Sequence, residues 1–107
     1  MNEGEIRRFW DAHPVGEQLS GALAGDYEQF FQRYDAHRYR TEGHILRRMD
    51  ALDLKGRELL EIGIGQGADS EQLIRRGAAW SGLDLSGEAV GRVNARLRLR
   101  DLPHRSV

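Results

Sequence analysis

A short apolar run that ends in three alternating glycines is the feature that most restricts how this chain can fold. The run from Leu59 to Ile62 continues into Gly63, Gly65 and Gly67, and an amphipathic segment follows. Because glycine lacks a Cβ atom, it adopts positive φ at low cost and lets a ligand approach the backbone closely. The free N–H groups at the start of the next helix would add hydrogen-bond donors. The pattern therefore predicts a strand, a ligand-binding turn and a helix.

The residues around this turn predict the first β-α-β-α portion of a doubly wound, Rossmann-like sheet, which is an α/β fold. Strands are expected at 57–62 and 78–85, and the apolar character of the first one indicates burial on both of its faces. A helix is expected at 69–76, where Gly77 supplies a C-terminal stop. Ser86 is placed to cap a last helix.

The first half of the chain is expected to be helical. Apolar residues recur every three or four positions at 4–12 and at 16–39, and Thr41 is placed to cap a third helix. We therefore divide the chain into a helical N-terminal extension, residues 1–55, and the first part of a Rossmann-like domain, residues 56–107.

Composition and charge exclude several classes of protein. The chain is 39% hydrophobic and 31% charged, which is typical of a globular sequence. It has no cysteine, and its four histidines lack the spacing of a helical metal site, so we expect no metal. The net charge of -1 gives no global attraction to nucleic acid, and no apolar run approaches the roughly 20 residues that cross a bilayer. These features predict a cytoplasmic protein without a nucleic-acid or membrane partner.

The C-terminal segment is locally basic, and we interpret its arginines as a solvated helix face rather than a site for an anionic partner. These arginines are Arg92, Arg96, Arg98, Arg100 and Arg105. An aromatic stripe in the first half is likewise expected to be core rather than pocket wall. Its members are Trp10, Phe30, Phe31, Tyr34 and Tyr39, of which Tyr34 and Tyr39, together with Arg40, are kept as candidates for a ligand pocket.

Asp84 supplies the second half of a candidate site. It ends the second expected strand, and in a parallel sheet that edge lies beside the glycine turn. Its carboxylate can accept two hydrogen bonds from the hydroxyls of a ribose. The glycine turn and Asp84 together therefore predict a ligand that contains a nucleoside.

With these motifs the sequence resembles the class I S-adenosylmethionine-dependent methyltransferases. The segment Glu61-Ile-Gly-Ile-Gly-Gln-Gly67 is similar to the first motif of that family, and Gly82-Leu-Asp-Leu-Ser86 is similar to its second. The segments Trp10-Asp-Ala-His-Pro14 and 34–40 are similar to members that act on small molecules and have a helical N-terminal extension. The resemblance implies S-adenosylmethionine as the cofactor and a small molecule as the methyl acceptor.

The resemblance also implies roles for individual residues. In the family the glycines line the methionine and ribose side of the cofactor, and the acid after the second strand binds the ribose hydroxyls. The residue after that acid flanks the adenine, and the glutamate before the glycines helps to position the methionine amino group. We therefore predict cofactor contacts from Glu61, Gly63, Gly65, Gly67, Asp84 and Leu85.

Other interpretations remain open at this point. The pattern Gly63-x-Gly65-x-x-Ala68 also fits a fingerprint of NAD(P)-dependent oxidoreductases, although Glu61 would there meet a pyrophosphate with a negative charge. A glycine turn with a purely structural role is a further alternative. A non-catalytic module that binds a nucleoside or a partner is another.

The family builds a seven-stranded sheet, and the sequence predicts only two of those strands here. The other strands would carry the catalytic groups and most substrate contacts, so we predict no catalytic residue. We expect this chain to be the N-terminal part of a methyltransferase that is inactive alone. The unpaired edges of its short parallel sheet would allow self-association.

Overall fold

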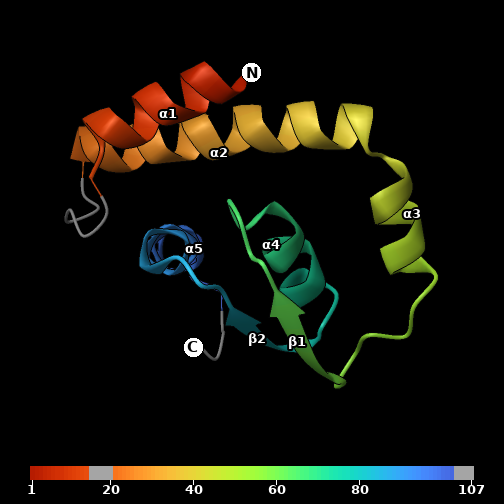
Figure 1. Cartoon of the computed structure of the whole chain (residues 1–107). Helices are drawn as coiled ribbons and strands as arrows, with labels where there is room; N and C mark the ends of the chain where they lie inside the picture. Colours follow the sequence, from red (N-terminus) through yellow and green to blue (C-terminus); the bar gives the residue numbers. More distant parts are fainter. Residues whose placement is uncertain (15–20, 103–107) are drawn as a thin grey trace.

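The computed structural model describes residues 1–14 and 21–102. The elements in chain order are α1 (Glu3–Ala12), α2 (Gly21–Thr41), α3 (His44–Asp50), β1 (Glu58–Ile62), α4 (Ala68–Arg75), β2 (Ala79–Leu83) and α5 (Gly87–Leu99) (Figure 1). The two strands pair in parallel, with Leu60 beside Ser81. This arrangement confirms an α/β fold in which N-terminal helices precede a β-α-β unit.

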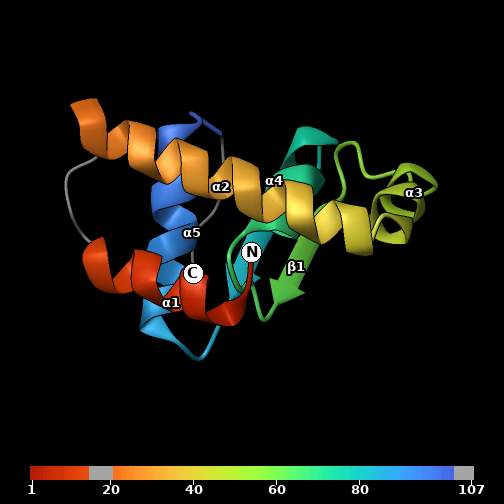
Figure 2. The same ribbon diagram turned by 90° about the horizontal axis from the view of Figure 1, so that it is seen from above.

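The elements are stacked in layers. α1 and α2 lie side by side on one side of the molecule, and α4 and α5 lie between them and the sheet (Figure 1). Seen from above, α2 crosses over both α4 and α5 (Figure 2). The core between the sheet and these two helices consists of Ile64, Ile74, Trp80, Ala89, Val93 and Leu97.

Aromatic packing holds α1 against α2. The ring of Phe9 stacks on that of Phe30 with 4.0 Å between centroids, and Tyr27, Phe30 and Phe31 are buried. The expectation that Phe30 and Phe31 belong to the core is therefore confirmed. Asn2 caps α1 by accepting a hydrogen bond from the Glu5 backbone N–H at 2.9 Å.

Two local expectations are wrong. Thr41 does not cap α3, because it is the last residue of α2 and its hydroxyl donates to the backbone oxygens of His37 and Arg38 at 3.1 and 3.0 Å. The second strand ends at Leu83, and the backbone bends at Leu85 rather than continuing as a strand. The expected helical residues 16–20, as well as Arg105, lie outside the described residues.

The expectation that β1 is buried on both faces is also wrong. Leu59 packs toward the helices, but Leu60 is 58% exposed and Ile62 is 74% exposed on the opposite face. Within residues 1–14 and 21–102, no helix covers that face (Figure 1). An apolar run shows that a strand favours burial, whereas burial itself requires a covering layer. Self-association through the sheet edge stays a prediction.

Arg98 is exposed, but Arg96 and Arg100 do not belong to a solvated face, which corrects a fourth expectation. Arg96 is 0% exposed, its Nε donates to Glu71 Oε1 at 3.0 Å, and its guanidinium also pairs with Asp35. Arg100 donates to Glu71 Oε1 at 2.7 Å and to Glu28 Oε1 at 2.8 Å. Because Glu71 lies on α4 whereas Glu28 and Asp35 lie on α2, these charges join three helices.

Within the two described ranges, none of the helices is both long and apolar enough to span a membrane.

Candidate functional site

The glycine turn joins β1 to α4 in the backbone conformation that its sequence predicts. Gly63, Gly65 and Gly67 have φ values of 78°, 56° and 84°, which L-residues with a side chain rarely adopt. A Cβ atom on Gly63 or Gly65 would meet nothing within 4 Å, whereas one on Gly67 would lie 3.1 Å from Val93 Cγ2. The first two glycines therefore border open space, and the third lets the turn pack against α5.

Asp84 lies beside this turn, as the topology predicts. Its Oδ2 accepts a hydrogen bond from the Ile64 backbone N–H at 2.9 Å, and its Oδ1 accepts one from the Ser86 N–H at 2.8 Å. Hydrogen bonds from these backbone donors lower the pKa of the Asp84 carboxyl, and the one from Ser86 has the largest effect. A carboxylate offers about four acceptor positions. The carboxylate therefore keeps an acceptor position for a ligand hydroxyl.

A small polar cavity of about 140 Å³ lies between α2 and the turn. Residues 63–69 form one wall together with Glu61, and Tyr34 and Arg38 contribute from α2. The cavity therefore brings together the predicted Glu61, Gly63, Gly65 and Gly67.

Glu61 is fixed in the wall of this cavity by two donors. Its Oε1 accepts hydrogen bonds from Ser70 Oγ at 2.6 Å and from Trp80 Nε1 at 3.0 Å. Burial raises the pKa of the Glu61 carboxyl, while these two donors oppose the increase. The side chain is thus held by α4 and β2, and as a carboxylate it can accept a hydrogen bond from a ligand ammonium group.

Arg38 is a residue that the sequence analysis missed. It donates to both carboxylate oxygens of Asp69, from Nε to Oδ1 at 3.0 Å and from Nη2 to Oδ2 at 2.6 Å. The Tyr39 hydroxyl donates to Asp69 Oδ1 at 2.8 Å, and burial together with this bond raises the pKa of Tyr39. Arg38 follows Tyr34 by four residues, so helical periodicity places both on one face and could have identified it.

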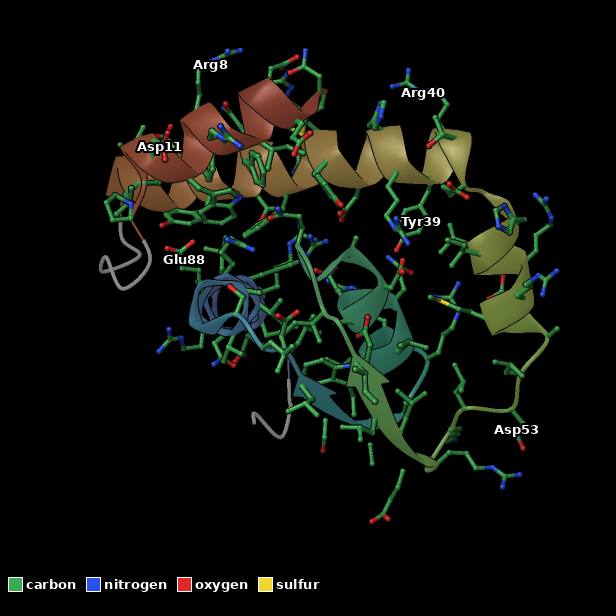
Figure 3. All side chains as sticks on the ribbon, viewed as in Figure 1. Arg8, Asp11, Tyr39, Arg40, Asp53 and Glu88 are labelled. Carbon is green, nitrogen blue, oxygen red and sulfur yellow. The ribbon has the colours of Figure 1, made fainter. Side chains whose placement is uncertain are left out.

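The three residues of α2 that were predicted as pocket candidates lie in different surroundings. Tyr34 lines the cavity, and Tyr39 points toward α4, where it contacts Asp69 (Figure 3). Arg40 is exposed and points away from α4, so its candidacy was wrong (Figure 3). The helical rotation of 100° per residue separates Arg40 from Tyr39.

The N-terminal helix α1 also reaches the glycine turn. Trp10 Nε1 donates to the side-chain oxygen of Gln66 at 3.0 Å, and the Arg92 guanidinium lies 5.5 Å from the centre of the Trp10 ring. These residues border a second cavity of about 340 Å³ between α1 and α5. Leu85, beyond the end of β2, is fully exposed. Gln66 was not singled out by the sequence, although it lies between two of the predicted glycines.

Comparison of the sequence with models of known protein families gives no match, and comparison with curated proteins gives no relative. Within the described parts of the chain, no cluster of three or more histidine, aspartate or glutamate side chains could hold a metal ion. The site therefore consists of a glycine turn, a carboxylate at the neighbouring strand end, and a cavity with charged walls.

Proposed function

We propose that this chain is the cofactor-binding, N-terminal part of an S-adenosylmethionine-dependent methyltransferase, built on the first strands of a Rossmann-like, doubly wound sheet. The observation that carries the proposal is the hydrogen bond between Asp84 and the Ile64 N–H, at 2.9 Å. It joins the end of β2 to the glycine turn, so that a carboxylate with the chemistry to accept hydrogen bonds from a diol lies beside a turn in which two glycines border open space.

The parts of the cofactor correspond to different parts of this site. Asp84 would hold the ribose hydroxyls, and the exposed side chain of Leu85 would cover one side of the adenine. The methionine end would enter the cavity beside Gly63 and Gly65, where Glu61 would receive its amino group. Bound S-adenosylmethionine would supply an electrophilic methyl group to a small-molecule acceptor. The residues of this chain would orient it, since alignment contributes much of the catalysis of a bimolecular reaction.

A cytoplasmic location and the absence of nucleic-acid and membrane partners remain part of this proposal. The net charge of -1 supports the absence of a nucleic-acid partner, because a nucleic-acid binder is usually basic.

The proposal predicts which ligands bind. By isothermal titration calorimetry we expect S-adenosylmethionine and S-adenosylhomocysteine to bind to this chain, and NAD⁺ and NADP⁺ to bind much more weakly. The physical reason is Glu61, whose carboxylate lies in the wall of the cavity formed by the turn and would repel a pyrophosphate. Tighter binding of a dinucleotide than of S-adenosylhomocysteine would refute the assignment and favour the oxidoreductase interpretation.

A second prediction concerns Asp84. We expect Asp84→Ala to weaken binding of S-adenosylhomocysteine roughly 10- to 100-fold, the range for lost hydrogen bonds to a charged group. The substitution also removes the acceptor of the Ile64 N–H, so the 2′,3′-dideoxyribose analogue of the ligand, which lacks both hydroxyls, provides the control. If Asp84 binds the ribose hydroxyls, the substitution should weaken binding of this analogue much less. Equal losses for both ligands would show that Asp84 only shapes the turn.

A further inference from the structure

The 140 Å³ cavity is lined by more negatively than positively charged side chains. Two carboxylates, Glu61 and Asp69, lie in its wall, and Arg38 is the one cation among the residues that line it. A ligand that carries an anionic group in this cavity would therefore have Arg38 as its one charged partner.

Arg38 is already paired with Asp69, but this ion pair is more exposed to water than the pair between Asp35 of α2 and Arg96 of α5. The Arg38 and Asp69 side chains are 29% and 25% exposed, so water reaches both. Those of Arg96 and Asp35 are 0% and 18% exposed. A buried pair is costly to separate, because each charge would remain without water, whereas a partly hydrated pair can change partners at small cost. The Arg38–Asp69 pair is therefore a contact between α2 and α4 that can exchange partners.

We propose that Arg38 changes partner when a ligand fills the cavity: its guanidinium leaves Asp69 and binds a ligand carboxylate, so that Asp69 acts as an internal competitor of the ligand. This inference rests on the proposed function, because it assigns the cavity to the α-amino-acid end of the cofactor. The planar guanidinium fits either carboxylate through two parallel hydrogen bonds. Glu61 remains available for the ammonium group, and the Tyr39 hydroxyl continues to hold Asp69.

The exchange has two measurable consequences. Removing the guanidinium should weaken only ligands that carry the carboxylate. Removing the charge of Asp69 should strengthen the same ligands, since a binding group that is occupied by a competitor is available only for part of the time.

The experiment compares two ligands by calorimetry. S-adenosylhomocysteine carries the α-amino-acid group, and 5′-methylthioadenosine has the same thioether and nucleoside without it. We expect Arg38→Gln to weaken the first ligand roughly 10- to 100-fold and to leave the second within about twofold. Asp69→Asn should strengthen the first and not the second. Arg33→Gln is the matched control, since Arg33 lies on the same helix and pairs with Glu5 at the surface.

The possible outcomes separate this inference from the proposed function. Equal losses of both ligands in Arg38→Gln would mean that Arg38 merely holds α2 in place, and would overturn the exchange while cofactor binding stands. Unchanged or weaker binding of S-adenosylhomocysteine to Asp69→Asn would overturn the competition. If the unaltered chain binds neither compound, the proposed function itself has failed.

Discussion

Replacing Arg96 by methionine is expected to lower the free energy of unfolding by about 3 kcal/mol, the lower end of the range for removing one partner of a buried ion pair. Arg96 is fully buried and forms ion pairs with the carboxylates of Glu71 and Asp35. Methionine fills similar space but leaves Asp35 with the Arg100 nitrogen at 3.6 Å. The loss is large beside a domain stability of about 5 to 15 kcal/mol. Urea denaturation followed by circular dichroism measures it.

Arg98 provides the control for this prediction. It lies on the same helix as Arg96 and is exposed. The substitution Arg98→Met should therefore change the free energy of unfolding by no more than about 0.5 kcal/mol. Similar effects of the two substitutions would contradict the view that the buried charges of Arg96, Glu71 and Asp35 hold the three helices together.

Replacing Gly65 by valine is expected to weaken binding of S-adenosylhomocysteine by about 100-fold or more, which corresponds to about 2.8 kcal/mol. The side chain would extend into the space beside the turn, where a Cβ atom meets nothing within 4 Å and where we place the ligand. Valine also tolerates a φ of 56° poorly, so the variant is expected to be less stable. Calorimetry at a temperature where the variant remains folded measures the binding.

Gly21→Val is matched to this variant. Gly21 has the same φ of 56°, and a Cβ atom on it would also meet nothing within 4 Å, but it begins α2 and does not line the cavity. The two variants should therefore lose similar stability, while only the Gly65 variant loses affinity. Equal affinities of the two variants would contradict the placement of the ligand at Gly65.

The sequence was sufficient for the features that depend on neighbouring residues or on strand topology. The apolar run, the glycines and the helix after them predicted the β-α-β unit. The rule that parallel strands end at one edge placed Asp84 beside the turn, where it accepts a hydrogen bond from Ile64. In both cases the deciding information is local, because it concerns segments joined by one short helix.

The features that the sequence did not predict depend on segments far apart in the chain. A charged residue on α5 looks solvated until its partners on α2 are known, and Asp35 lies far from Arg96 in sequence. Similarly, the three glycines look equivalent in the motif. Only the position of α5 shows that Gly67 packs against Val93 while Gly65 borders open space.

The ion pairs between α2 and α5 also determine when the chain can fold during synthesis. Translation produces α2 before α5, so Glu28 and Asp35 have no access to Arg100 and Arg96 until the last described helix has been made. Until then the Asp35 carboxylate, which is 18% exposed in the fold, stays in water, since burying an unpaired charge is unfavourable. The aromatic contacts between α1 and α2 can form early, but α2 can reach its final position against α5 only after Arg96 and Arg100 have been synthesised.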